Sequence, residues 1–262
     1  MSTASHAEIT DSHLERVEEK ALSSQFQVLS CSEYARDLRQ AFCVAGTMED
    51  DKTTISHRLI QREWPLFQSV QGIGGPSACQ SDKRTFYIMR MSQFMTWPLS
   101  ALKSYEEDLK LAEAEGRNLL TEKYAYMMCI SEPGQHQILE DSLPGITQSK
   151  QDLIVQIVSV IMVWASEMEQ QFPWLMKASR PISSGQDTQM VSIETYTKGE
   201  LSTYSERTLT MLLRYYQEAK ASGKNLHKAA LERMISYYGY DSMTQADLDI
   251  KARFGPGNVA IK

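Results

Sequence analysis

The stretch "AEAEGRNLLTEKYAYMM", residues 112–128, indicates two helices joined by a tight corner. Gly116 lies where the first helix should end, because glycine adopts the left-handed conformation at little cost. Asn118 follows where its side chain can cap the next helix. The apolar residues beyond it recur at helical spacing rather than alternating as in a strand. This stretch therefore predicts a helix–corner–helix unit.

The same corner recurs in "AKASGKNLHKAALERMI", residues 219–235, at a constant offset of 107. When the sequence is aligned with itself at that offset toward the N-terminus, Trp97 corresponds to Tyr204 and Gln93 corresponds to Glu200. A repeat of this length predicts a duplicated four-helix unit packed about a pseudo-two-fold axis. The alternative is that two helical hairpins acquired the same Gly-Lys/Arg-Asn-Leu corner independently.

Under duplication, the two halves comprise approximately residues 53–130 and 150–240. Two loops rich in glycine, serine and proline, at 71–83 and 178–190, correspond at the same offset and would face each other across the axis. The linker between the halves carries two Pro-Gly pairs and should be a surface connection.

Helical periodicity dominates the whole chain, and long alternating strand patterns are absent from it. We expect an all-α bundle: a single helical domain over residues 51–262, preceded by a helical extension over residues 1–50. Ser149 with Asp152 can cap the most apolar helix. The expected helices span residues 7–21, 32–46, 53–70, 84–96, 99–115, 118–130, 150–171, 190–200, 205–221 and 224–238.

The amino-acid composition disfavours several classes of protein function. The formal net charge of −6 and the absence of a basic arm count against tight non-specific binding of nucleic acid. The apolar run at residues 153–165 has 13 residues, whereas a membrane span needs about 20, so a buried core helix and no membrane association are expected. Residues 1–25 contain no apolar segment typical of a secretory signal. Four scattered cysteines suggest reduced thiols in a cytoplasmic protein.

The loop "GIGGPSACQ", residues 72–80, is the first candidate for chemistry. A phosphate-binding P-loop is disfavoured because no lysine follows the glycines until Lys83 and the preceding segment is helical. Glycines do allow the backbone to approach a ligand closely, and such a loop could present Cys79 as a nucleophile. The alternative is that Cys79 packs as a small apolar residue.

The second loop leads into a segment where carboxylates alternate with tyrosines. Glu194 and Lys198 are four residues apart, as are Tyr196 and Glu200, so each pair shares a helix face. Glutamates beside tyrosines can bind a cationic substrate or transfer protons, although a solvated helix face would also explain the Glu–Lys pair. Asp187 lies within the same loop.

Two arginines are candidates for binding an anionic group. Arg90 and Arg180 could form forked contacts with a carboxylate or phosphate, or could pair structurally with Glu63, Glu122 or Asp187. No histidine lies three residues after a glutamate, and no His-Glu-x-x-His motif occurs, so no metal site is expected.

Several motifs in fixed order resemble a small helical domain-of-unknown-function family of bacteria and fungi. They are "REWPLFQSVQGIGGPSACQ", "FYIMRMSQFMTW", "SYEEDLKLAEAEGRNLLTEKYAYMM", "ETYTKGELSTYSERTL" and "YYGY", and the likeness extends from about Ser56 to Ser242. The signature-like positions that this resemblance implies are Glu63, Gly74, Gly75, Cys79, Gln80, Arg90, Gln93, Glu122, Tyr124, Arg180, Asp187, Glu194, Tyr196, Glu200 and Tyr204.

In size and family setting the chain is also similar to the fungal arginine-containing cyclodipeptide synthases. That resemblance implies an enzyme that takes arginyl-tRNA and a second aminoacyl-tRNA and closes a diketopiperazine without ATP or a cofactor. The resemblance implies Cys79 or Ser77 as acyl acceptor, Tyr196 or Tyr204 in proton transfer, and Glu194 as a further catalytic residue. Asp187, Glu194 and Glu200 would form an acidic pocket for the guanidinium. The implied substrate-binding residues are Glu63, Gly74, Gly75, Gln80, Arg90, Gln93, Glu122, Arg180, Asp187 and Glu200.

Two other classes of function remain open. One is an enzyme that acts on free amino-acid or guanidine-type metabolites without tRNA. The other is a non-catalytic helical protein whose acidic helices bind a basic partner. The acidic net charge argues against a broad tRNA-binding track, although Lys83, Arg84, Arg90, Lys103 and Arg117 could supply one in the first half.

Overall fold

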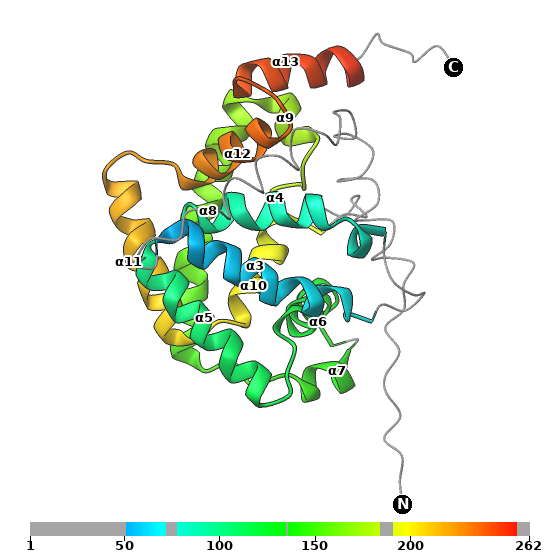
Figure 1. Ribbon diagram of the computed structural model, residues 1–262, viewed down its shortest axis with the longest axis vertical. Coiled ribbons are helices and arrows are strands. Elements are labelled where there is room, and N and C mark those ends of the chain that lie inside the picture. Colours follow the sequence, from blue (N-terminus) through cyan, green and yellow to red (C-terminus); the bar gives the residue numbers. More distant parts are fainter. Residues whose placement is uncertain (1–50, 72–77, 135, 184–190, 256–262) are drawn as a thin grey trace, which may run out of the picture.

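The computed structural model describes residues 51–71, 78–134, 136–183 and 191–255, with the backbone alone at 78 and 79. Within these ranges every regular element is helical, which confirms the all-α prediction (Figure 1). The predicted helices at 7–21 and 32–46 lie outside the described residues. The elements are α3 (Lys52–Gln68), η2 (Ala78–Ser81), α4 (Lys83–Phe94), α5 (Leu99–Ala114), α6 (Leu119–Ser131), α7 (Gln137–Ser142), α8 (Gln148–Gln171), α9 (Pro173–Lys177), α10 (Ile193–Ser202), α11 (Glu206–Ala221), α12 (Leu226–Tyr237) and α13 (Met243–Phe254).

Each helix predicted from residue 53 onward has a counterpart whose ends differ by a few residues. Helix α8 begins earlier than expected because Thr147, not Ser149, is its cap and accepts a hydrogen bond from the Lys150 amide. Three helices were not predicted: α7 within the linker, α9 and α13. The first two are only 6 and 5 residues long, too short to show a helical period.

The two glycine corners form as predicted. Gly116 and Gly223 adopt φ of 70° and 73°, the left-handed conformation that ends α5 and α11. Asn118 then accepts hydrogen bonds from two amides of α6, and Asn225 accepts one from α12. Each asparagine also donates through Nδ2 to a carbonyl of a neighbouring long helix, Leu66 on α3 or Trp164 on α8. The corners therefore fix tertiary position as well as helix ends.

The two halves follow the same order of helices. Helices α5 and α11 start 107 residues apart and end 107 residues apart. Two pairs of equivalent residues touch: Gln93 donates to Glu200, and the rings of Trp97 and Tyr204 lie 5.6 Å apart. Equivalent residues can meet only near a two-fold axis, so these contacts fit the proposed symmetry. Duplication itself stays a prediction, as does the facing of the two loops, because residues 72–77 and 184–190 are outside the described ranges.

The main hydrophobic core lies between α3, α4, α5, α8 and α11. A second core joins α9, α12 and α13, which form the upper part of the molecule in Figure 1. Asp247 on α13 links this helix to α9 by accepting hydrogen bonds from the amides of Trp174 and Leu175, both at 2.8 Å. A carboxylate at the start of α9 satisfies amides that the short helix leaves free.

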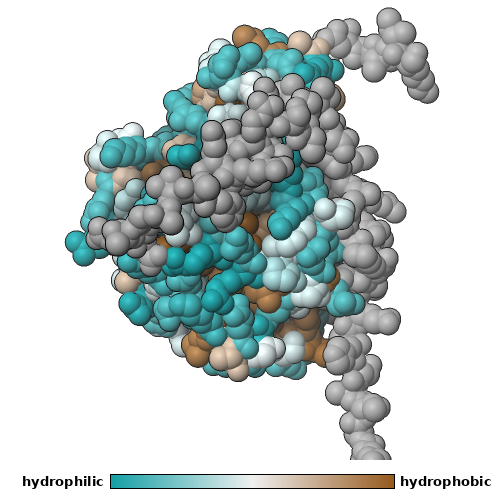
Figure 2. Space-filling view, in the orientation of Figure 1, coloured by the Kyte–Doolittle hydropathy of each residue, from teal (hydrophilic) through white to brown (hydrophobic). Residues whose placement is uncertain are grey.

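Helix α8 carries the apolar run and packs one face inward, burying among others Ile157, Trp164 and Met168. Val155 and Val163 on its opposite face are exposed. Among the described helices, α8 alone is long and apolar enough to cross a membrane. Figure 2 shows a largely hydrophilic face with small, separate hydrophobic areas. Exposed apolar residues lie on different helices, for example Leu111 on α5 and Leu248 on α13.

Helices α6 and α10 approach closely because α10 presents a glycine at the contact. A Cβ atom on Gly199 would lie 2.4 Å from Met127 Cγ and 2.9 Å from the Lys123 carbonyl oxygen. The side chain of Met127 could move, but the carbonyl belongs to the α6 backbone. Only glycine therefore permits this separation of the two helices.

We expect Gly199→Ala to lower the free energy of unfolding by about 1–3 kcal/mol, because the extra methyl must push α6 and α10 apart. Urea denaturation of both proteins would measure the change. Gly145→Ala is the matched control, since a Cβ there meets nothing within 4 Å. Equal stability of the two variants would show that the close approach of α6 and α10 is not required.

Candidate functional site

A buried ionic cluster centres on Arg90 of α4. Its Nε and Nη2 donate to the two carboxylate oxygens of Glu63 on α3, at 2.7 and 2.5 Å. Its Nη1 donates to Glu200 on α10 at 2.5 Å and to Gln93 at 2.7 Å. The forked geometry uses both edges of the planar guanidinium. Arg90 therefore joins α3, α4 and α10 at one point.

The two carboxylates receive further donors from neighbouring helices. Tyr105 on α5 donates its hydroxyl to Glu63 at 2.6 Å, and Tyr204 donates to Glu200 at 2.6 Å. The two tyrosine rings meet edge to face at 4.7 Å between centroids. Lys123 on α6 places its ammonium 3.6 Å from the second oxygen of Glu200. Two positive and two negative charges thus balance inside the protein.

Burial and neighbouring charges shift the pKa values of Glu200 and Arg90 in opposite directions. Glu63, Arg90 and Glu200 are each at most 5% exposed. Burial alone raises the pKa of Glu200, but Lys123 and Arg90 outweigh it and lower that pKa well below its ordinary value. Although burial opposes the charge on Arg90, Glu63 and Glu200 raise its pKa well above the usual range. Burial raises the pKa of the Tyr105 and Tyr204 hydroxyls, so both remain protonated donors.

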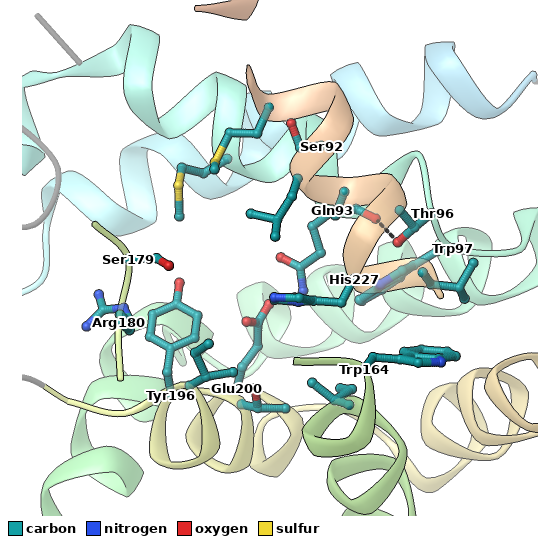
Figure 3. Close-up of a pocket in the computed structure, with 18 of the residues that line it drawn as sticks. Ser92, Gln93, Thr96, Trp97, Trp164, Ser179, Arg180, Tyr196, Glu200 and His227 are labelled. Atoms are coloured by element: carbon teal, nitrogen blue, oxygen red, sulfur yellow. Dashed lines mark hydrogen bonds between the residues drawn. The ribbon is translucent and has the colours of Figure 1, made fainter. Parts of the chain in front are cut away.

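A pocket of about 270 Å³ opens above this cluster, with Glu200 and Gln93 in its lining. Figure 3 shows both side chains directed into the cavity from α10 and α4. The walls are mainly apolar and aromatic, and come from α4 and the turn after it, α8, α9, α10, α11 and α12. Their members include Met89, Trp97, Ile161, Trp164, Leu201, Tyr216, Leu231 and Met234.

Arg180 and Tyr196 form one side of the pocket (Figure 3). Two cations lie over the Tyr196 ring: Lys123 at 3.7 Å from its centroid and the Arg180 guanidinium at 4.7 Å. Among the described residues Arg180 forms no ion pair with a carboxylate, and its guanidinium donates a 3.4 Å hydrogen bond to the Val191 carbonyl. Because Arg180 also lines the pocket, its guanidinium could contact an anionic group of a ligand.

The structure brings together some of the predicted site residues. Gln93, Arg180, Tyr196 and Glu200 line the pocket. Glu63, Arg90 and Tyr204 form the ionic cluster, which supports the pocket through Glu200. For Arg90, the structural pairing with Glu63 considered from the sequence is present.

Other predicted residues lie elsewhere. Gln80 is buried and donates to the backbone carbonyls of Phe67 and Val70, both at 2.8 Å, closing the end of α3. Glu122 forms a two-bond pair with Arg117 at the start of α6. Glu194 pairs with Lys198 at 2.6 Å on a half-exposed face of α10, as a solvated helix face predicts.

Five predicted positions fall on parts of the chain that the structure does not describe. Gly74, Gly75, Asp187 and Ser77, the alternative acyl acceptor, lie outside the described residues, as does the side chain of Cys79.

The polar site residues that were not predicted include Lys123 and Tyr105 in the cluster and His227 and Ser92 in the pocket lining. Lys123 did leave a signal in the sequence, because Leu119, Leu120 and Met127 at helical spacing place it on a buried face. A lysine there requires a partner. His227 left a similar signal, because Ala230, Leu231 and Met234 at helical spacing place it on an apolar face of α12.

The described residues contain no group of three histidine, cysteine, aspartate or glutamate side chains placed to hold a metal ion. The pocket lining carries acid, amide, imidazole and guanidinium groups. Its fixed charges are an anion, Glu200, in the lining above the cluster and a cation, Arg180, at one side.

Loss of Arg90 should destabilise the fold strongly. Arg90→Met leaves the Glu63 carboxylate buried with only Tyr105 as donor, and breaking a buried ion pair from one side costs about 3–5 kcal/mol. The free energy of unfolding measured in urea would show the loss. Arg214→Met is the matched control, because the Arg214–Glu218 pair is highly exposed and should contribute little. Similar free energies of unfolding for Arg90→Met and Arg214→Met would contradict a stabilising role for the cluster.

The stabilising effect of Glu200 should depend on pH. Because its pKa in the folded protein lies below the ordinary value of 4.5, the unfolded chain takes up the proton first as the pH falls. The stabilisation is therefore complete above that value and is lost progressively below it. The difference in unfolding free energy between the wild type and Glu200→Gln should narrow as the pH is lowered from about 6 to 3. A difference that stays constant over this range would contradict the assignment.

Comparison with known proteins places the chain in a family without assigning a reaction. No curated protein and no solved structure matches it significantly. A family profile described as "Protein of unknown function (DUF4125)" matches residues 53–248, which contain the ionic cluster and every residue of the pocket lining. Since this match covers most of the sequence, the chain belongs to the DUF4125 family.

Proposed function

We propose that the pocket is the active site of an aminoacyl-tRNA-dependent cyclodipeptide synthase that forms an arginine-containing diketopiperazine. One observation carries the proposal: a carboxylate that stays ionised, Glu200, lines a small pocket with aromatic walls. An anion in such a setting suits a cationic side chain with an apolar stem, and arginine has both.

The hydrogen bonds of Glu200 leave one oxygen for the ligand. Its Oε1 already accepts from Arg90, Gln93 and Tyr204. Its Oε2 has only the Lys123 ammonium, at 3.6 Å, beyond normal hydrogen-bond length. A guanidinium N–H could therefore donate to Oε2 without displacing a protein donor. The buried cluster would hold the carboxylate in place before the ligand arrives.

The size of the pocket supports a ligand of one or two amino acids. Sites for drug-sized ligands have volumes of about 300–1,000 Å³, and this pocket has about 270 Å³. A folded RNA or a protein domain cannot enter it, so only the aminoacyl end of a charged tRNA would be inside. Arg180 at one side is placed to pair with a phosphate or carboxylate near that end.

The reaction needs no outside energy source, because each amino acid arrives as an activated ester. The α-amino nitrogen of one aminoacyl group attacks the ester carbonyl carbon of the other. The C–O bond to the tRNA ribose breaks, and the released hydroxyl takes the proton. A second attack of the same kind closes the ring and releases the second tRNA. Tyr196, whose hydroxyl Figure 3 shows pointing toward Ser179 within the pocket, could pass the protons.

Tyr204 and Arg90 take a supporting role under this proposal. Both lie in the cluster beneath Glu200 rather than in the pocket lining. Cys79 stays a candidate acyl acceptor from the sequence, and a route through it would add one acyl transfer from tRNA to the thiol. Direct transfer between two aminoacyl esters requires no such step.

The test is mass spectrometry of products formed by the full chain with total tRNA, aminoacyl-tRNA synthetases, ATP and all amino acids. We expect the mass of a cyclic arginyl dipeptide, and its loss when ribonuclease is added. A product that survives ribonuclease would favour an enzyme of free metabolites instead. No product from tRNA shown to be charged would overturn the proposal and favour a binding role.

Arg180→Gln should lower the rate of product formation about tenfold or more, because a charge-assisted contact to the substrate is lost. Stability should change little, since Arg180 forms no ion pair among the described residues. Arg214→Gln removes a highly exposed arginine that does not line the pocket and should retain full activity. An unchanged rate for Arg180→Gln would remove this residue from the site.

A further inference from the structure

Unpartnered polar atoms gather at the pocket. Among the described residues, the buried side-chain atoms without a hydrogen-bond partner are Ser92 Oγ, Trp97 Nε1 and His227 Nε2. All three residues line the pocket. Trp97 also interacts with the Tyr216 hydroxyl, so His227 and Ser92 carry the argument. Buried polar groups in folded proteins nearly always have partners, and those that do not mark places where a ligand or water completes the bonding.

His227 is held in its neutral form. Burial lowers the pKa of its imidazole to about 4. At neutral pH the ring therefore offers one N–H donor and one lone pair, with no net charge. Ala230, Leu231 and Met234 follow it on the same face of α12 and also line the pocket. Figure 3 shows the imidazole reaching into the cavity from the side opposite Arg180.

Charged and neutral polar groups therefore occupy different parts of the pocket lining. Glu200 and Arg180 provide the charges, whereas His227 and Ser92 provide uncharged hydrogen-bonding atoms among apolar side chains. A charged ligand group placed beside a neutral imidazole and apolar walls would lose its hydration without gaining a counter-charge. The complementary group is uncharged and able to hydrogen bond, and an amide, which has both N–H and C=O, suits an imidazole in either tautomer.

We propose that His227, assisted by Ser92, is a substrate-positioning residue that hydrogen bonds an uncharged amide of the ligand in the pocket. The inference deepens the proposed function and rests on it for the identity of the amide, since a diketopiperazine ring contains two of them. Glu200 would hold the cationic side chain while His227 orients the ring. No covalent step is assigned to the imidazole.

The experiment uses piperazine-2,5-dione, the bare ring with two amides and no side chain. The full chain is labelled with ¹⁵N-histidine, and its five histidines are observed by NMR. The resonance missing in His227→Gln identifies His227. We expect titration with the ring to shift the Nε2 signal of His227 and to leave that of His136, which pairs with Glu132, unchanged. Cyclohexane-1,4-dione, which has acceptors only, should bind more weakly.

Two variants separate hydrogen bonding from packing. His227→Phe fills similar space without a polar atom and should weaken binding of the ring about tenfold, the value of one good hydrogen bond. His227→Gln keeps a donor and an acceptor and should lose less. An unmoved Nε2 signal at saturation, equal affinity in His227→Phe, or no binding up to the solubility limit of the ring would each overturn the inference.

Failure of this inference can be told from failure of the proposed function. The ring contains no arginine and the titration contains no tRNA. Ring binding that shifts His227, together with no cyclic dipeptide in the tRNA assay, would keep the amide-recognition role and reject the synthase. A ribonuclease-sensitive cyclic dipeptide formed equally well by His227→Phe would keep the synthase and reject the role of His227.

Discussion

The charge on Arg90 is the constraint on which the rest of this structure depends. A guanidinium buried to this extent is tolerated only if carboxylates and further donors surround it, because its hydration is lost. Meeting that demand requires Glu63 from α3, Glu200 from α10 and, behind them, hydroxyls from Tyr105 and Tyr204. The position of each helix is then fixed by hydrogen bonds as well as by apolar packing, which by itself is less directional.

The same cluster links the fold to the pocket. Glu200 uses one oxygen to complete the cluster, and its side chain also lines the cavity. A carboxylate held by three donors does not need to reorganise when a ligand binds, which is the condition for efficient recognition. The glycine at position 199 adds to this arrangement, because it lets α10 approach α6 and brings Lys123 beside Glu200. The stability of the core and the geometry of the site therefore share the same side chains.

The candidate site was only partly visible in the sequence. Glu200 and Tyr196 were expected on one face of a helix because they are four residues apart, and both line the pocket. The pairing of Arg90 with Glu63 and Glu200 spans 27 and 110 residues, and no local pattern selects those partners. His227 shares an apolar face of α12 with Ala230, Leu231 and Met234, but the helices that α12 packs against, α4 and α8, are distant in sequence. The central residues of the two loops, 72–77 and 184–190, lie outside the described ranges, so the roles predicted for Gly74, Gly75 and Asp187 stay predictions.

What the sequence determined by itself is the set of long helices and their corners. Hydrogen bonds within a helix join residues four apart, and caps such as Asn118 and Asn225 act over two or three residues, so both can be read locally. Tertiary structure alone decided that α9 forms and packs against α13, since α9 is too short to be stable without Asp247 and its apolar neighbours. The tertiary structure also determines where the pocket lies, because its walls form only where helices from both halves of the chain meet.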